Sequence, residues 1–181
     1  VAMPLEDGNT STAEVGAIMG DGDSSVDAIN LWDSASQQWI ASTNYGGGFW
    51  DPELLVENGS ALYFNAIEPF AFYSIGSLPA AHPVYSVVAG LNTAMVPLNL
   101  NAAWTSEVGI TMGDGDSSVD AINLWDAGSQ QWIASTNYGG GFWDPELEVS
   151  IGSPLYFNAI ETFTWPNGRS TSIRASRSSN K

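Results

Sequence analysis

The feature that most constrains this chain is an internal repeat. Residues 16–72 return as residues 109–165 at a constant shift of 93, and only 11 of the 57 aligned positions differ. Each repeat is near the lower size limit of an independently stable domain, because a small domain buries a small fraction of its surface. With 44% apolar and 12% aromatic residues, the chain can still bury two small cores or one shared core. The sequence therefore predicts two copies of one small module.

The pattern within each copy favours β structure with one short helix. Residues 11–14, Ser-Thr-Ala-Glu, have the spacing of a capping box, and Gly20 is placed to end a helix. Apolar runs at 28–32 and 38–42 flank a polar turn, as in a β-hairpin. Residues 44–52 contain three glycines and a proline, so we expect a loop. Further strands are predicted at 1–5, 54–56, 62–67, 70–75 and 84–93, with 54–56 and 62–67 forming a second hairpin.

These elements predict an all-β fold class: two tandem duplicated small modules, similar to β-sandwiches or barrels, each with one short helix. Residues 76–83 are rich in glycine and proline and read as a linker. We therefore expect a first module at residues 1–83, a second module at 84–168 and a basic tail at 169–181.

One module is expected to be a strand short. Copy one starts at Val1, the equivalent of Ala94, so nothing before it matches the predicted strand at 84–93. Whichever copy that strand belongs to, the other copy lacks its counterpart. An unpaired sheet edge exposes backbone donors and acceptors that can pair with another strand.

The tail offers a strand for that edge. All 20 acidic residues precede position 169, whereas all four basic residues lie in the last 13 positions. Polar and apolar residues alternate in the tail with the period of a half-buried strand. The residues of this predicted assembly strand are Thr171, Ile173, Arg174, Ala175 and Arg177. Our leading hypothesis is that the tail completes the incomplete module of a neighbouring molecule, giving a head-to-tail filament. The alternatives are a disordered tail, including a cloning remnant, and a tail that closes copy two within its own molecule.

A second hypothesis concerns aspartates in a glycine-containing turn. Three carboxylates fall within seven residues in each copy, and hard oxygen ligands of this kind suit calcium. The predicted metal ligands are Asp21, Asp23, Asp27, Asp114, Asp116 and Asp120. The spacing lacks the later glycine and the bidentate glutamate of the EF-hand loop. The alternative is a solvated Asp/Ser turn that caps the following strand.

Aromatic residues recur in both copies and could bind sugars. Trp32 and Trp39 are expected in the core, because core packing is the more frequent role of aromatic residues. The glycine-rich loop is expected to expose its own rings beside carboxylates. The predicted glycan platform consists of Tyr45, Trp50, Asp51, Tyr138, Trp143 and Asp144. The corresponding functional alternative is a calcium-dependent glycan-binding adhesin module.

Other function classes find little support. The chain has one histidine, His82, and no cysteine. We therefore expect no disulfide, no pair of histidines that binds zinc, and no Ser-His-Asp triad that recurs with the repeat. We therefore predict that the protein is not an enzyme. A body this acidic repels nucleic acid and anionic membranes. No apolar run reaches the length of a membrane span, so we expect no membrane insertion. The start at Val1 indicates a processed mature chain or an excised fragment.

The second copy contains the run Tyr85…Gly90-Leu-Asn92…Pro97-Leu98, followed by Trp125-Asp126, Gln131-Trp132 and Gly152…Tyr156-Phe157. In these residues the chain resembles the small β modules repeated in secreted prokaryotic cell-surface proteins. Modules of that family open with the Tyr-x-x-x-x-Gly strand, so the resemblance favours copy one as the incomplete module. Modules of this kind act as stalks, adhesin segments or spacers, which implies an extracellular or cell-surface location, a structural role and no known active site. We therefore expect an extracellular structural subunit that polymerises with itself into a filament or surface layer.

Overall fold

The computed structural model describes residues 1–3, 5–6, 8–22 and 24–166. It confirms the predicted all-β fold with one short helix in each half. In chain order the elements are α1 (Thr12–Ala17), β1 (Val26–Asp33), β2 (Gln38–Asn44), β3 (Trp50–Asp51), β4 (Leu62–Ala66), β5 (Tyr85–Val87), β6 (Gly90–Met95), α2 (Thr105–Gly109), β7 (Val119–Asp126), β8 (Gln131–Asn137), β9 (Trp143–Asp144), β10 (Pro154–Ala159) and β11 (Phe163–Trp165). We call residues 1–83 the first module and residues 84–166 the second module.

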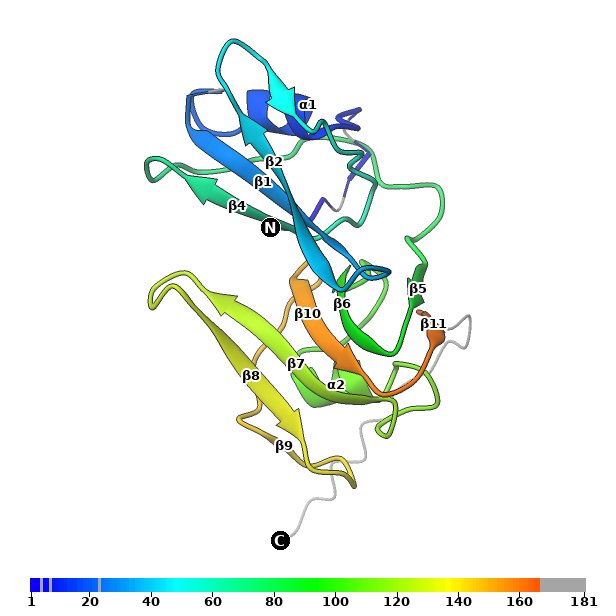
Figure 1. The fold of residues 1–181 in the computed structure, drawn as a ribbon. Helices are drawn as coiled ribbons and strands as arrows, with labels where there is room; N and C mark the ends of the chain where they lie inside the picture. Colours follow the sequence, from blue (N-terminus) through cyan, green and yellow to red (C-terminus); the bar gives the residue numbers. More distant parts are fainter. Residues whose placement is uncertain (4, 7, 23, 167–181) are drawn as a thin grey trace, which may run out of the picture.

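The strands form two main antiparallel sheets, one in each module (Figure 1). The first sheet has the order β3-β2-β1-β4, and the second has the order β6-β10-β7-β8-β9. Strands β11 and β5 form a small separate sheet. The hairpin register recurs with the repeat, since Trp32 faces Trp39 in β1–β2 and Trp125 faces Trp132 in β7–β8. The second sheet differs from the first in having β6 as an additional outer strand.

The turn of each long hairpin is held by one aspartate. Asp33 accepts hydrogen bonds from the backbone amides of Ala35 and Ser36 and from the Ser36 hydroxyl. The hydroxyl contact, followed by the amide contacts, holds the pKa of the exposed Asp33 carboxyl below its usual range. Asp126 makes the equivalent bonds in the second module. The sequence Asp-x-x-Ser-Gln therefore fixes the hairpin locally, as side chains of this kind do in turns.

The two helices begin with different caps. The Ser11 hydroxyl accepts a hydrogen bond from the Glu14 amide at 3.3 Å, as the capping-box spacing predicts. Trp104 stands at the same place before α2 and makes no side-chain cap bond. The glutamate of the capping box binds the backbone in both modules. Glu14 accepts a hydrogen bond from the Thr10 amide, and Glu107 accepts one from the Ala103 amide.

Each core is closed by a tryptophan packed against the helix. Trp50 and Trp143 are only 4% and 5% exposed. A Cβ atom on Gly16 would lie 2.3 Å from Cζ2 of Trp50, and one on Gly109 would lie 2.3 Å from Cζ2 of Trp143. Glycine is therefore needed in each helix to let the indole approach the backbone.

Several predicted strands are wrong in detail. Residues 54–56 do not form a hairpin with β4, because Leu55 bridges Ser11 and the Val56 amide donates to Thr10. Of residues 1–5, the four that the structure describes contribute a single bridge, Ala2 to Ala61, and residues 70–75 form no strand.

The segment predicted as one strand at 84–93 is two strands, β5 and β6. The break occurs because the Asn92 side chain accepts from the Val88 amide and donates to the carbonyls of Val88 and Gly90. No helix among the described residues is long and apolar enough to cross a membrane.

Candidate functional site: the open edge of the first sheet

The two modules meet through six aromatic rings in a two-fold arrangement. Trp32 of the first module lies edge-on to Tyr156 at 5.1 Å, and its equivalent Trp125 lies edge-on to Tyr63 at 5.2 Å. Trp39 and its equivalent Trp132 complete the cluster, and each contacts both tyrosines. Burial in this cluster raises the pKa of Tyr156. Such a reciprocal contact is isologous, as in a two-fold dimer, so the two modules cover equivalent sheet faces on each other.

The prediction that Trp32 and Trp39 belong to a module core is therefore wrong. Neither side chain is part of the buried cluster of its own module, and both are partly exposed. The aromatic residue that fills that core is Trp50. Alternation along β1 and β2 turns Trp32 and Trp39 away from the helix and toward the other module.

The clearest difference between the modules lies along β4. In the second module, six residues of β10 pair with β6, from Pro154 opposite Met95 to Ala159 opposite Gly90. In the first module, Val1 exchanges two hydrogen bonds with Leu62, of 2.9 and 2.7 Å. Beyond this point no described segment pairs with the outer side of β4. Because hydrogen-bonding pairs alternate along an antiparallel ladder, the amides and carbonyls of Phe64 and Ala66 face this unpaired side.

The unpaired edge exposes side chains that are covered in the second module. Phe157 is fully buried and Ala159 is 3% exposed, whereas the equivalent Phe64 is half-buried and Ala66 is exposed. Trp165 is also fully buried, and its equivalent Phe72 is half-buried. The sequence around β4 and β10 is nearly the same, so the difference comes from the strands that cover β10.

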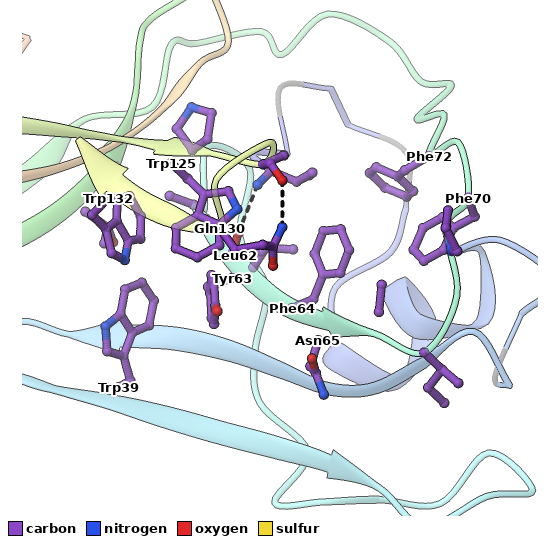
Figure 2. A pocket seen from close by; sticks show the side chains of 18 of the residues that line it. Trp39, Leu62, Tyr63, Phe64, Asn65, Phe70, Phe72, Trp125, Gln130 and Trp132 are labelled. Carbon is purple, nitrogen blue, oxygen red and sulfur yellow. Dashed lines mark hydrogen bonds between the residues drawn. The ribbon is translucent and has the colours of Figure 1, made fainter.

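A cavity of about 770 Å³ lies along this edge (Figure 2). Its walls include Tyr63, Phe64 and Ala66 of β4 and, from the second module, Trp125 and Gln130. Figure 2 shows these lining residues together with Leu62, and Trp125 lies edge-on to Tyr63 across the cavity. We call this cavity the open groove. It is bounded by the outer edge of β4 on one side and by the β7–β8 hairpin of the second module on the other.

The equivalent place in the second module contains β6. The tip of the β1–β2 hairpin lies next to this strand (Figure 1). Gln37 accepts a hydrogen bond from the Leu91 amide at 2.7 Å and donates one to the Leu91 carbonyl at 2.9 Å. The Trp32 indole also donates to the Leu91 carbonyl, at 2.8 Å. Strand β6 is thus paired with β10 on one side and held by two side chains of the first module on the other.

Gln130 and Trp125 are the repeat equivalents of Gln37 and Trp32. Gln130 has a φ of 56°, the same as Gln37, and its Nε2 donates to Ala127 at 2.8 Å, as Gln37 does to Ser34. Within the described part of the chain, Oε1 of Gln130 and Nε1 of Trp125 have no hydrogen-bond partner. The side chains that hold β6 therefore have counterparts at the open groove in the same conformation.

The hydroxyl of Tyr85 connects the two modules through hydrogen bonds. It donates to the Gly59 carbonyl of the first module at 3.0 Å and accepts from the Met95 amide of the second at 3.1 Å. Burial raises the pKa of Tyr85 to about 12. At the groove itself, burial lowers the pKa of the Val1 amino group to about 6.

Five of the six predicted metal ligands lie in the described part of the chain, and the structure does not gather these five into one group. Among the described residues, no group of three or more acidic or histidine side chains is placed to hold a metal ion. Asp120 accepts two hydrogen bonds from Asn158, and Asp27 accepts two from Asn65. Asp116 accepts from the Gly141 amide and from the Trp143 indole.

The other predicted metal ligands are Asp21, Asp114 and Asp23. Asp21 and Asp114 are exposed, and the backbone amide of each donates to a serine hydroxyl. Asp23 lies outside the described residues. The carboxylates of Asp27, Asp116 and Asp120 therefore accept hydrogen bonds from amide and indole groups of the loops and strands around them.

The predicted glycan platform is divided by the fold. Trp50 and Trp143 are buried in the cores, which corrects the expectation that they are exposed. Asp51 and Asp144 are exposed beside them. Tyr45 and Tyr138 are exposed as expected, and they pair with Phe49 and Phe142 at centroid distances of 5.8 and 5.9 Å. Glycan binding by these loop pairs stays a prediction.

The predicted assembly strand, Thr171, Ile173, Arg174, Ala175 and Arg177, lies outside the described residues. Sequence reasoning placed Gln37 beside the possible sugar platform, and it did not predict that Gln37 holds β6 or that Gln130 lines the open groove. The available signal was a glutamine at the tip of both hairpins, but an exposed turn residue gives no indication of a contact with a distant strand.

Comparison of the chain with protein-family models, with curated protein sequences and with solved structures gives no match. The functional conclusion therefore rests on the fold and on the open groove.

Proposed function

We propose that this chain is a structural subunit that self-assembles by receiving a β-strand of a neighbouring molecule in the open groove. One observation carries the proposal: β10 has β6 along its outer edge, whereas the described residues leave the equivalent edge of β4 unpaired beyond Leu62. An unpaired edge with apolar side chains beside it favours the addition of another strand.

The arrangement of the modules supports an open-ended assembly. The aromatic cluster already covers the equivalent sheet faces of the two modules. What differs between the modules is the open groove, where the first module has no counterpart of β6 among the described residues. A strand that reaches the groove from a different part of a second molecule makes a heterologous contact. Heterologous contacts that do not close into a ring give filaments.

The proposed donor is the basic tail, residues 169–181, of the second molecule. The tail carries all four basic residues of a chain with a net charge of −16, so it is attracted to the acidic body. The resemblance to secreted surface modules supports an extracellular or cell-surface filament or layer.

The proposal is tested by filling the groove within one molecule. Val1 is the repeat equivalent of Ala94, so a second copy of residues 84–93 fused before Val1 enters in the register of β6. We expect the unmodified chain to self-associate with increasing concentration in sedimentation velocity and to give filaments in electron micrographs. The fusion protein is expected to stay monomeric and to unfold at a higher denaturant concentration.

A fusion with the same ten residues in scrambled order is the matched control. It has the same length and composition but lacks the pattern of β6, so it should leave association unchanged. A chain that remains monomeric at all accessible concentrations, or a fusion protein that assembles as readily as the unmodified chain, would refute the proposal.

A further inference from the structure

We infer that the open groove selects a strand with glycine opposite Ala66, and that Gly168–Thr171 of a second copy is that strand. The inference rests on the proposed function and deepens it, because it names the segment, its register and the side chains that hold it. The occupied site of the second module provides the template.

The requirement for glycine comes first from the backbone of the occupying strand. Gly90 has a φ of +105°, a conformation that residues with a side chain rarely adopt. A Cβ atom built on it would also lie 2.6 Å from Oε1 of Gln37, so the end of that flexible side chain would have to shift. Gln37 cannot move away without losing both of its hydrogen bonds to Leu91. Since Gln130 has the backbone conformation and the internal hydrogen bond of Gln37, a strand in the open groove meets the same restriction.

The pattern of the occupying strand occurs at two places in the chain. The residues that follow the break in the second module are Gly90-Leu-Asn-Thr93, and Gly168 together with the first three residues of the tail reads Gly168-Arg-Ser-Thr171. No other Gly-x-Asn/Ser-Thr sequence is present among the 181 residues. Matching the two segments places Gly168 opposite Ala66, Arg169 opposite Asn65 and Thr171 opposite Tyr63, as Gly90, Leu91 and Thr93 lie opposite Ala159, Asn158 and Tyr156.

Charge favours the tail at this position. Residues directly opposite in an antiparallel pair share one face of the sheet, so Arg169 shares the face of Asn65. The Asn65 amide donates to both carboxylate oxygens of Asp27, at 2.8 and 2.9 Å, and Glu68 is in the groove wall. The arginine therefore enters beside carboxylates in a module whose sequence contains no lysine or arginine.

The outer side of the strand is held by the second module. Leu91 turns its amide and carbonyl away from β10 and toward Gln37 and Trp32. In the matched register the amide and carbonyl of Arg169 point toward Gln130 and Trp125 instead. The backbone of a strand in the groove thus finds hydrogen-bond partners on both sides, from β4 and from the side chains of the second module. The affinity of the groove for that strand therefore depends on both modules.

Engineered cysteines test the register directly, because the chain has no cysteine of its own. Asn65 and Arg169 form a non-hydrogen-bonded pair in this register, with Cα atoms about 4.5 Å apart, a distance that a disulfide can bridge. We mix the single variants Asn65→Cys and Arg169→Cys under mild oxidation and expect a cross-linked dimer on a non-reducing gel. Asn65→Cys mixed with Ser170→Cys is the control, because that side chain faces the other side of the sheet.

Two further variants test the selection. Gly168→Val should abolish association, and Gln130→Ala should weaken it about tenfold, which corresponds to the loss of two hydrogen bonds. Gln37→Ala is the matched control: it removes the same side chain from the occupied site, so it should lower the stability of the second module and leave association unchanged.

The outcomes separate this inference from the proposed function. A chain that self-associates but gives no cross-link at Arg169, or cross-links equally at Ser170, overturns the inference and leaves strand addition by another segment. A cross-link that forms within one chain of the double variant Asn65→Cys/Arg169→Cys, and not between chains, overturns the second copy as donor. A chain that neither associates nor cross-links refutes both.

Discussion

The two modules allow one substitution to be made twice in nearly the same sequence but in different surroundings. Phe157 is fully buried beneath β6, whereas its equivalent Phe64 lies half-buried at the open groove. Truncating a fully buried phenylalanine removes its transfer free energy and leaves a cavity, at a cost of about 3–5 kcal/mol. Phe64 is only partly exposed, so most of the transfer contribution remains, but the groove leaves a smaller closed cavity. We therefore expect Phe64→Ala to cost less than Phe157→Ala, about 2–3 kcal/mol.

The measurement is equilibrium unfolding in urea, followed by tryptophan fluorescence and circular dichroism. Each alanine variant is compared with the unmodified chain in the free energy of unfolding of the module that carries it. Ile29→Val and Ile122→Val serve as a matched control pair, because both side chains are fully buried. These two variants should cost the same, about 0.5–1.5 kcal/mol each.

The same comparison in the fusion protein completes the test. With residues 84–93 supplied before Val1, Phe64 is covered, so the cost of Phe64→Ala should rise toward that of Phe157→Ala. Equal costs for the two alanine variants in the unmodified chain would show that the groove is closed in solution, and the reasoning from burial would fail.

Three further predictions concern single contacts. Tyr85→Phe should remove a phenol that titrates near pH 12 in ultraviolet absorbance, because burial raises the pKa of Tyr85 to about 12. The stabilisation that comes with this raised pKa is complete below pH 10 and should be lost as the pH rises from 10 to 12, so the unfolding free energy of Tyr85→Phe should lack this pH dependence. Gly16→Ala should destabilise the first module by about 1–3 kcal/mol in thermal unfolding, because the new methyl group collides with Trp50, and an unchanged melting temperature would contradict that packing. Trp32→Phe should cost about 1 kcal/mol more than Trp125→Phe, since only the first indole donates a hydrogen bond within the described residues; equal costs would argue against the hydrogen bond to β6.

Local chemistry made several elements predictable. Residues 33–37 form a hairpin turn because the Asp33 carboxylate binds the amides that follow it, and this interaction needs no distant partner. The start of α1 was predictable for the same reason, from the Ser11 cap. The loop at 44–52 followed from its glycines, although its last residues add the short strand β3.

Burial of the aromatic residues was not predictable in this way. Trp50 was expected at the surface because of its glycine-rich loop, but a glycine in the distant helix α1 admits its ring to the core. Trp32 and Trp39 were expected in the core and lie between the modules. Whether an aromatic ring is buried depends on what faces it, and no neighbouring residue in the sequence carries that information.

The sequence by itself determined the repeat, the all-β character and the turns, because these depend on composition, period and contacts between near neighbours. Only the tertiary structure decided that residues 84–93 cover the second module and that Gln130 faces an uncovered edge in the first. Two almost identical sequences therefore have different surroundings, since the partner of a strand edge and the side chains that hold it come from residues far away in the chain.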